Sequence, residues 1–489
     1  MSVQTRETIY ALSSGRLPAA IAVVRISGPA AAAALKAIAG KIPEPRKAAL
    51  ARVRGCDGEI IDEALMLWFP APNSETGEDV AELQLHGGRA VIASVFAALS
   101  RVPGLRPAEA GEFTRRAFEN GKLDLTAVEG LADLVMAETE GQRRLAFRQM
   151  TGALGRRAEN WRAQLIQALA LVEARIDFSE EADVPQDLVT PALRIARALE
   201  AEIGSVLADR GRGERLREGL IVAIAGPPNV GKSTLLNRIA RREAAIVSPY
   251  AGTTRDVIEV HLDLGGLPVT LLDTAGIRET DDPVELEGVR RARERANTAD
   301  LVVWMVDASE KATSPLAAGP PANKVPSSVT VWVVRNKIDL IQDAQRNELG
   351  NQSNGSNESR SRVNKFLTDM VNEQLPRTNE LAFNASESTF NLSAQSGEGF
   401  DALIGRLTKY AETFLAGAES ALVTRERHRR VLEDVTAALR RALQSDLAGR
   451  EDLLAEEFRL AARALGRLTG RVDVEDVLDA IFRDFCIGK

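Results

Sequence analysis

Near the middle of the chain, residues 226–233 read Gly226-Pro227-Pro228-Asn229-Val230-Gly231-Lys232-Ser233, which fits the phosphate-loop pattern G-x-x-x-x-G-K-S. An apolar run, Leu220–Ala225, precedes the loop, and a helix-like stretch, Ser233–Arg241, follows it. In this strand–loop–helix context, backbone N–H groups close on phosphate oxygens at the start of a helix. We expect Lys232 to reach the outer phosphates and the Ser233 hydroxyl to hold Mg²⁺. The loop predicts a nucleoside triphosphate site but does not indicate the base.

Three further motifs follow the phosphate loop, each directly after an apolar, strand-like run. Asp273-Thr274-Ala275-Gly276 offers a carboxylate to Mg²⁺ through water and, at its glycine, an N–H to the γ-phosphate. In Asn336-Lys337-Ile338-Asp339, the terminal carboxylate can accept hydrogen bonds from guanine N1–H and the 2-amino group, which adenine does not supply. The lysine stem of this motif can lie along the base. Backbone N–H groups of Ser393-Ala394-Gln395 can meet guanine O6. The motifs in this order predict GTP as the ligand.

The segment between the phosphate loop and Asp273-Thr274-Ala275-Gly276 is typical of a nucleotide-dependent switch. In Gly252-Thr253-Thr254-Arg255-Asp256, a Thr hydroxyl can bind Mg²⁺ only when the γ-phosphate is present. We assign Thr254 to Mg²⁺, together with Ser233. The residue directly after Gly276 departs from the Ras pattern, because Ile277 occupies the position where Ras-type GTPases have a water-orienting Gln. Either hydrolysis is slow or another group orients the water, and the nearby carboxylates are Glu279, Glu285 and Glu287.

The composition bounds the class of protein. At 489 residues the chain is too long for one core, and about three domains are expected. The net charge of −7 excludes a generally basic nucleic-acid coat and leaves RNA contact to local patches. The chain has two cysteines, Cys56 and Cys486, and no apolar run long enough for a signal core or a bilayer span. These features predict a reduced, cytoplasmic protein that does not enter a membrane.

Changes of pattern along the chain divide it into three parts. Strand-like runs near the N-terminus indicate an α+β domain, and helical spacing of Ala, Leu, Arg and Glu on both sides of the phosphate-loop module indicates one helical domain that the module interrupts. The predicted fold is multidomain α/β and α, with an inserted Ras-like P-loop GTPase domain. The strand-like runs are Ile21–Ile26, Ala64–Phe69 and Val80–Leu85. The predicted boundaries are 1–120 for the α+β domain, 121–216 and 416–489 for the helical domain, 217–415 for the GTPase domain and 342–362 for a mobile insert within it.

Motifs outside the phosphate-loop module carry a resemblance to a known family. They are Val24-Arg25-Ile26-Ser27-Gly28, Thr76-Gly77-Glu78-Asp79-Val80, His86-Gly87-Gly88, Gly111-Glu112-Phe113-Thr114, Arg116-Ala117-Phe118, Lys122-Leu123-Asp124-Leu125, Ile176-Asp177-Phe178 and the C-terminal Phe485-Cys486-Ile487-Gly488-Lys489. Together with the guanine motifs they resemble the MnmE (TrmE) family of tRNA modification GTPases over nearly the whole chain. The resemblance implies that residues 1–120 form a folate-binding-like domain that also makes a homodimer.

The resemblance implies a particular activity. Such proteins bind 5-formyl- or 5,10-methylene-tetrahydrofolate and form a heterotetramer with a flavoprotein, MnmG (GidA), which carries FAD. Together they add an aminomethyl-type (carboxymethylaminomethyl) group at C5 of the wobble uridine of certain tRNAs, and K⁺ stimulates the GTPase. The alternative is a GTP-dependent ribosome-assembly or RNA-binding switch without modification chemistry, and the C-terminal and folate-like motifs argue against it.

Matching motifs assign folate contacts and a cysteine to this chain. Arg25, Glu82, Lys122 and Lys489 match the family's folate contacts, where a carboxylate suits a pterin edge and cationic side chains suit a glutamate tail. For Cys486 two interpretations stay open. Its apolar flanks are typical of a tucked hydrophobic end, whereas the family motif favours a catalytic or folate-adjacent role if its thiol pKa is lowered.

Matching motifs also complete the expected nucleotide site. Asn229, Ser248, Tyr250 and Thr253 fall at the family's K⁺ ligands, and a cation there offsets developing charge as an arginine finger does. Glu285 matches the family's water-directing glutamate, which would replace the missing Gln. The residues expected to bind GTP are Asn229, Val230, Gly231, Lys232, Ser233, Thr234, Ser248, Pro249, Tyr250, Ala251, Gly252, Thr253, Thr254, Asp273, Thr274, Ala275, Gly276, Asn336, Lys337, Asp339, Ser393, Ala394 and Gln395.

Overall fold

The chain forms two compact units, which are described separately here. The first comprises Met1–Val135, Ala146–Ala208 and Glu426–Lys489, and the second comprises Met136–Leu145 and Asp209–Arg425. The computed structural model describes residues 7–178, 187–209, 211–242, 245–246, 259–273, 299–309, 330–341, 389–444, 450–472, 478, 481–482 and 488. The second unit thus interrupts the first, and it also takes in a short segment from the predicted helical region. The domain boundaries given above stay a prediction.

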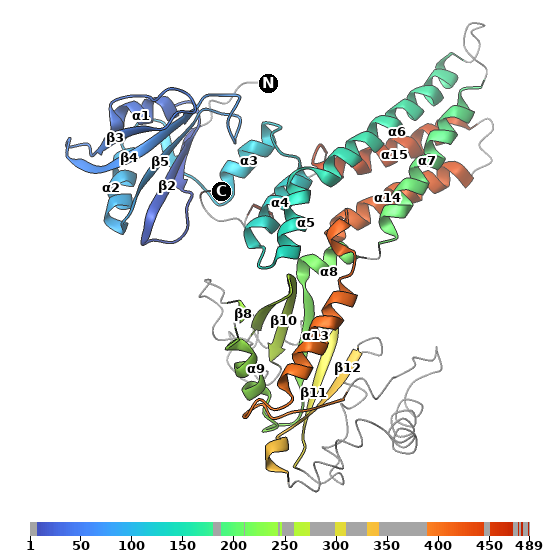
Figure 1. Cartoon of the computed structure of the whole chain (residues 1–489). Helices are drawn as coiled ribbons and strands as arrows, with labels where there is room; N and C mark the ends of the chain where they lie inside the picture. Colours follow the sequence, from blue (N-terminus) through green and yellow to red (C-terminus); the bar gives the residue numbers. More distant parts are fainter. Residues whose placement is uncertain are drawn as a thin grey trace, which may run out of the picture. The chain divides into compact units, whose positions relative to one another are not determined.

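The first unit begins with a six-stranded sheet in the order β3-β4-β5-β2-β1-β6 (Figure 1). All neighbouring strands are antiparallel except β1 and β6, which are parallel. Its strands are β1 (Thr8–Leu12), β2 (Ala19–Ser27), β3 (Ala49–Arg54), β4 (Ile60–Phe69), β5 (Val80–Gly87) and β6 (Leu105–Pro107). The strands expected from the apolar runs at the N-terminus are therefore confirmed, within β2, β4 and β5.

Two helices cover one face of this sheet, and on the opposite face Phe113 packs on Ile9 and Ala11 of β1. Inward-facing residues alternate along β2, β4 and β5 and pack against α1 (Ala31–Ala39) and α2 (Arg89–Leu99). On the opposite face, the large apolar side chains of Ile21, Leu50 and Leu65 are 62%, 60% and 43% exposed. Such alternation is typical of an antiparallel sheet with one solvated face, but apolar residues of this size on that face mark a surface suited to a partner.

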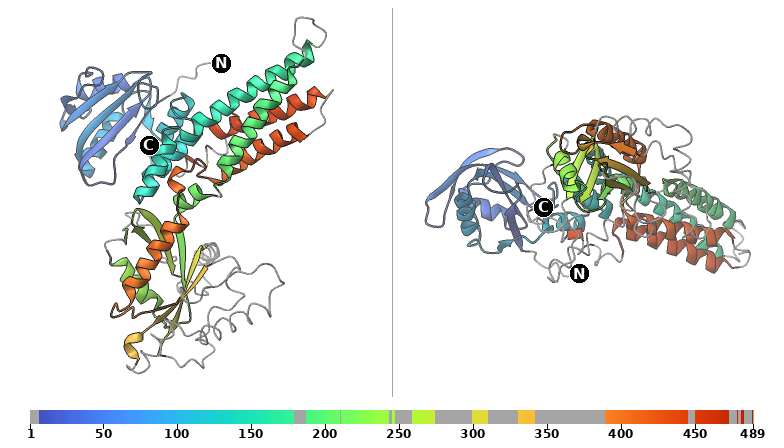
Figure 2. Two further views of the ribbon diagram at one scale, coloured as in Figure 1. Left: turned by 45° about the vertical axis from the view of Figure 1, so that its right-hand side comes forward. Right: turned by 90° about the horizontal axis from the view of Figure 1, so that it is seen from below.

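Helices complete the first unit. The helices α6 (Ala153–Asp177), α7 (Val189–Leu207), α14 (Glu426–Gln444) and α15 (Glu451–Thr469) pack side by side in a bundle (Figures 1 and 2). Because α6 and α7 precede the second unit and α14 and α15 follow it, the bundle is discontinuous in sequence. The shorter helices are α3 (Glu112–Glu119), α4 (Leu125–Met136) and α5 (Glu140–Met150). None of the helices that could be assessed in the described ranges is both long and apolar enough to cross a membrane.

A buried ionic cluster joins the two sequence-distant parts of the helical region. The Glu129 carboxylate on α4 contacts His428 Nε2 at 2.6 Å and Arg427 Nη2 at 2.8 Å, both on α14. Burial alone would raise the pKa of Glu129, but His428 and Arg427 outweigh burial and hold that pKa well below its usual range. A buried carboxylate held by Arg427 and His428 fixes the register between α4 and α14, because removing the arginine would leave its buried charge poorly compensated.

The second unit is a seven-stranded sheet in the order β13-β12-β11-β7-β10-β9-β8. Strands β7, β10, β11, β12 and β13 are parallel, and β9 and β8 extend the edge antiparallel. The strands are β7 (Leu220–Ala225), β8 (Ala245–Ile246), β9 (Glu259–Leu264), β10 (Leu267–Asp273), β11 (Leu301–Asp307), β12 (Thr330–Asn336) and β13 (Thr389–Asn391). Helices α9 (Lys232–Ala240) and α13 (Phe400–Phe414) pack on the sheet (Figures 1 and 2). The short helices are α8 (Arg212–Glu218) and the 3₁₀ turns η4 (Ile338–Leu340) and η5 (Ala418–Ser420).

The carboxyl ends of these parallel strands meet at one edge, which is where open α/β sheets bind ligands. The phosphate loop follows β7, Asp273 ends β10, and Asn336 ends β12. Several predicted residues lie outside the described residues. They are Ser248, Pro249, Tyr250, Ala251, Gly252, Thr253, Thr254, Thr274, Ala275, Gly276, Glu285, Cys486, Lys489 and the segment 342–362.

Candidate nucleotide site and ligand cavity

The phosphate loop joins β7 to α9 and is closed by its own lysine. Lys232 Nζ donates to the carbonyl oxygens of Gly226 at 2.9 Å and Pro227 at 2.7 Å, and the residue is only 8% exposed. Asn229 has a φ of 63°, in the left-handed region that side chains seldom adopt. Ser233 and Thr234 are exposed in the first turn of α9, where helix N–H groups lack intrahelical partners. Ser233 therefore lies where a phosphate-bound Mg²⁺ would be held.

Asn336 locks three of the predicted motifs together. Its side-chain Nδ2 donates to the Val230 carbonyl at 2.7 Å, and its Oδ1 accepts the Ala394 N–H at 2.8 Å. A Cβ at Gly231 would lie 2.3 Å from Asn336 Nδ2, so only glycine permits this approach. The structure therefore brings the phosphate loop, the base motif and the 393–395 loop to one place, although long stretches of sequence separate them.

Lys337 and Asp339 flank the position expected for the base. Lys337 has a φ of 66°, and its Nζ contacts Asp307 Oδ2 at 2.6 Å. Burial alone would raise the pKa of Asp307, but hydrogen bonds from Lys337 and Ser309 lower it overall. Asp339 is exposed in η4, with its carboxylate open to solvent. Asp307 was missed in the sequence, although a carboxylate at the end of the apolar run 301–306 is a signal that could have found it.

A second candidate site lies on the face of the N-terminal sheet opposite α1 and α2. A cavity of about 500 Å³ is lined by Arg46, Phe69, Asn73, Ser74, Glu75, Val80 and Glu82. Arg25 Nη2 pairs with Glu82 Oε1 at 2.9 Å, and Arg25 also pairs with Glu75. Two of the predicted folate contacts, Arg25 and Glu82, therefore lie together at this cavity. Sequence reasoning missed Arg46, Phe69 and Glu75.

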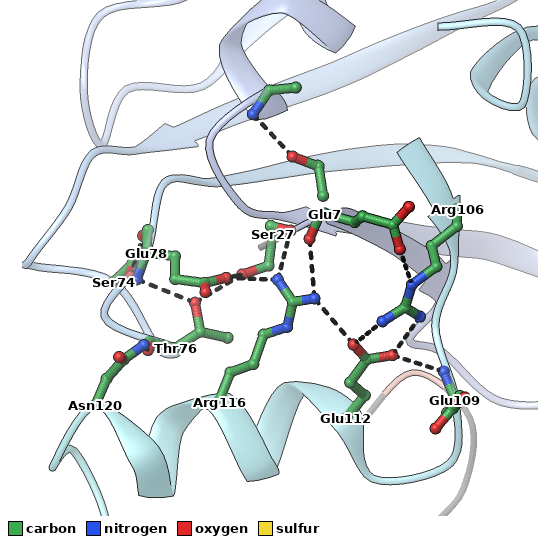
Figure 3. A network of polar contacts seen from close by, with 12 residues as sticks. Glu7, Ser27, Ser74, Thr76, Glu78, Arg106, Glu109, Glu112, Arg116 and Asn120 are labelled. Atoms are coloured by element: carbon green, nitrogen blue, oxygen red, sulfur yellow. Dashed lines mark hydrogen bonds and ion pairs between the residues drawn. The ribbon is translucent and has the colours of Figure 1, made fainter. Parts of the chain in front are cut away.

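A buried network holds the cavity loop from behind (Figure 3). The Arg116 guanidinium, 5% exposed, contacts Glu78 Oε2 and Glu112 Oε1 at 2.9 Å each. Ser27 Oγ lies 2.8 Å from Thr76 Oγ1 and 2.9 Å from Glu78 Oε2. Since Asn73, Ser74 and Glu75 line the cavity immediately before these anchors, α3 and β2 fix the wall of the cavity. The sequence motifs that contain Ser27, Glu78 and Arg116, to which no chemical role was assigned, thus support the wall of the cavity.

The remaining folate residues are described only in part. Lys122 follows α3 and is exposed, and its Cε lies 3.3 Å from the position a Cβ would take at Gly77. In the C-terminal motif, the Gly488 carbonyl accepts a hydrogen bond from Ser13 Oγ at 2.7 Å. This contact places the end of the chain at the β1–β2 loop of the same sheet. Within the described ranges, no group of three or more His, Cys, Asp and Glu side chains is arranged to hold a metal ion.

The parallel sheet, the phosphate loop at its carboxyl edge and the Asn336 lock define a P-loop GTPase. Family models agree: one described as the MnmE helical domain matches residues 125–486, and one described as the GTP-binding protein TrmE N-terminus matches 8–122. The chain belongs to the MnmE family of tRNA modification GTPases. It is a GTP-hydrolysing enzyme, and the predicted fold class, with its α+β N-terminal domain, discontinuous helical domain and inserted P-loop GTPase, is confirmed.

Full-length relatives carry this assignment. The tRNA modification GTPase MnmE of Rhodopseudomonas palustris is 54% identical over 483 residues, covering 99% of each chain. That of Parvibaculum lavamentivorans is 51% identical over 486 residues, covering 99% of this chain and 100% of the relative. Among solved structures, Era from Aquifex aeolicus bound to GDP and AlF₄⁻ is 29% identical over 39% of this chain and 56% of that chain, with a TM-score of 0.26, too low to support any structural inference.

Proposed function

We propose that this GTPase acts on tRNA together with an MnmG (GidA)-type flavoprotein that carries FAD, in a heterotetramer. The product is a tRNA whose wobble uridine bears a carboxymethylaminomethyl group at C5. The observation that carries the proposal is the end-to-end identity of 54% to a relative named as a tRNA modification GTPase. A ligand cavity in the first unit, in addition to the guanine motifs of the second unit, also supports modification chemistry over a simple GTP switch, because a switch has no need of a second small-molecule site.

The test is nucleoside analysis of tRNA from cells that lack this chain. We expect the C5-modified wobble uridine to disappear and to return with the intact chain. Lys232→Ala should fail to restore it, because the phosphate loop loses its ammonium group. Cys56→Ser is the matched control, because Cys56 is exposed in a turn and belongs to neither site, and it should restore the nucleoside fully. An unchanged nucleoside profile would overturn the proposal.

For the cavity, we infer a folate ligand such as 5-formyl- or 5,10-methylene-tetrahydrofolate. Glu82 offers acceptors to a pterin edge, while Arg25, Lys122 and Lys489 would meet carboxylates of the glutamate tail. The ligand supplies a one-carbon unit, and the chain's residues bind and orient it. Glu82→Gln should weaken 5-formyltetrahydrofolate binding in equilibrium dialysis. Glu63→Gln is its control, because Glu63 pairs with Arg52 at an exposed position of the same sheet. Equal binding by both variants would contradict this assignment.

We infer that a second copy of the chain covers the exposed part of the sheet face opposite α1 and α2 and makes the homodimer. Ile21, Leu50 and Leu65 present apolar area there, and the cavity lies on the same face. Burying such side chains stabilises an interface by roughly 25 cal/mol per Å² of apolar surface before association costs. Replacing Ile21 with Asp should shift the protein to monomer in sedimentation, and a variant that stays dimeric would contradict this interface.

The nucleotide chemistry follows from the phosphate-loop residues. We infer that Ser233 and Thr254 hold Mg²⁺, and that Asn229, Ser248, Tyr250 and Thr253 hold K⁺. The left-handed φ of Asn229 supports this, because such strain is kept where a side chain has a task. Glu285 would orient the attacking water in place of Ile277. The GTPase rate should be higher in K⁺ than in Na⁺, and Asn229→Ala should remove the difference. Glu285→Ala should slow turnover strongly with GTP affinity nearly unchanged; an unchanged rate would remove this role.

A further inference from the structure

An arginine of the phosphate-loop helix reaches the loop that follows β13. Arg238 lies on α9, and its Nη1 donates to the carbonyls of Ala394 at 3.1 Å and Gln395 at 2.8 Å. Its Nη2 donates to the Ser396 carbonyl at 2.9 Å. The guanidinium also lies over the Phe400 ring, with its Cζ 5.7 Å from the ring centroid. One planar cation thus binds three successive carbonyls, and the fixed fork of the guanidinium holds them in one orientation.

The loop is shaped to admit this guanidinium. Gly397 has a φ of 94°, and a Cβ there would lie 2.0 Å from Arg238 Nη2. Any side chain at this position would therefore displace the arginine, besides straining the backbone. Arg238 and Gly397 form one device built from two distant segments, and none of the four guanine motifs includes either residue.

The backbone N–H groups of the 393–395 loop differ in their hydrogen bonding. The Ser393 N–H donates to the Glu398 carbonyl at 2.9 Å, and the Ala394 N–H donates to Asn336 Oδ1 at 2.8 Å. In the described part of the chain, the Gln395 N–H has no protein acceptor, and Gln395 is exposed whereas Ser393 and Ala394 are buried. Of the loop N–H groups expected to meet guanine O6, the Gln395 N–H is thus the one left available.

The two observations meet in a single peptide group. In a trans peptide the C=O and N–H bonds point in opposite directions, so a cation on the Ala394 carbonyl fixes where the Gln395 N–H points. A hydrogen bond from a charged donor also polarises the peptide and strengthens its N–H as a donor. We propose that Arg238 is a positioning residue for guanine recognition, which holds the Ala394–Gln395 peptide so that its N–H binds O6 of the base.

The experiment couples the arginine to one atom of the ligand. Dissociation constants are measured on the full chain, freed of nucleotide, for GDP, for 6-thio-GDP, whose sulfur is a weak acceptor in place of O6, and for IDP, which lacks the 2-amino group. Arg238→Met should weaken GDP binding by about tenfold, the effect of one lost charge-assisted hydrogen bond. The preference for GDP over 6-thio-GDP should shrink in the variant, whereas the preference for GDP over IDP, set by Asp339, should stay as in the wild type.

Matched variants separate positioning from simple loss of structure. Arg242 also lies over Phe400, at 4.9 Å, but pairs with the Asp401 side chain, so Arg242→Met removes similar packing and should leave all three constants within about twofold. Arg238→Lys keeps a cation and should recover part of the preference for GDP over 6-thio-GDP. This variant also tests the proposal if Arg238→Met folds poorly. The proposal is overturned if the variant keeps the full O6 preference, or if its GDP/IDP preference falls by the same factor.

Discussion

The nucleotide site and the N-terminal cavity are built in opposite ways. In the predicted nucleotide site, the motifs lie in short loops, and side chains such as Asn336 tie those loops together. In the cavity, charged side chains from β2, β5 and the loop between β4 and β5 meet across an open sheet face. Parallel strands bring the loops at their carboxyl ends to one edge of the sheet. The residues of the nucleotide site therefore occur in short contiguous motifs, each directly after a strand. The residues of the cavity are dispersed along the chain, because strand pairing brings them together.

The largest effect should follow from removing Asp339, the carboxylate that is predicted to bind the guanine base. Asp339→Asn replaces two acceptors with an amide whose NH₂ group faces the guanine N1–H. GDP affinity should fall by roughly a hundredfold or more, while XDP, which offers an acceptor at C2, should gain. Isothermal titration with both nucleotides measures the exchange. Folate binding to the first unit should not change, because the two sites share no described residue.

The control for this variant is another exposed aspartate of the same unit. Asp401 pairs with Arg242 at the start of α13, and Asp401→Asn should leave GDP and XDP binding as in the wild type. If Asp339→Asn lost GDP without any gain for XDP, the carboxylate would be supporting the loop instead of reading the base. That result would make the nucleotide site resemble the cavity, where charged side chains support the backbone.

The next largest effect should come from the network behind the cavity. Arg116→Met leaves Glu78 and Glu112 without their shared buried cation and should lower the free energy of unfolding of the first unit by about 3 kcal/mol. Thermal unfolding of the full chain measures it, and GDP affinity should be unaffected. Arg52→Met removes an exposed pair on the same sheet and should cost less than about 0.5 kcal/mol. Equal costs for both variants would contradict a supporting role for Arg116.

The same variant should change how the first unit responds to acid. Burial would raise the pKa of Glu112, but hydrogen bonds from Arg106, the Glu109 N–H and Arg116 lower it overall. The carboxylate therefore adds stability above its unfolded pKa of about 4.3, and this stability is lost as the pH falls through the lower folded value. Urea midpoints between neutral and acidic pH should fall less steeply in Arg116→Met than in the wild type. A parallel decline would show that Arg116 does not set this pKa.

The contrast between contiguous motifs and dispersed residues also explains how much of the fold and of the two sites the sequence predicts. The phosphate loop, Asn336 and Asp339 were found because each lies in a contiguous motif directly after an apolar strand. The fold class followed from helical spacing on both sides of that module. Arg46, Phe69 and Glu75 were not found, because their segments meet at one cavity only through the pairing of β4 with β5 and the hydrogen bond from the Arg46 N–H to the Trp68 carbonyl. Arg238 was not found either, since an arginine on an amphipathic helix is indistinguishable in sequence from a solvated charge.

The smallest effect should come from Asp307, a side chain that supports a motif without belonging to it. Asp307→Asn keeps the shape of the group but loses the charge that holds Lys337 Nζ at 2.6 Å. Because the lysine stem covers the base face and reads no ring substituent, GDP and IDP affinity should both fall by about threefold to tenfold, with their ratio unchanged. Ser309→Ala removes the Ser309 hydroxyl donor to Asp307 but keeps the Ser309 N–H donor, and it should have a smaller effect in the same direction. If Asp307→Asn changed the GDP/IDP ratio, Asp307 would act through Asp339 and the loop would recognise the base as one unit.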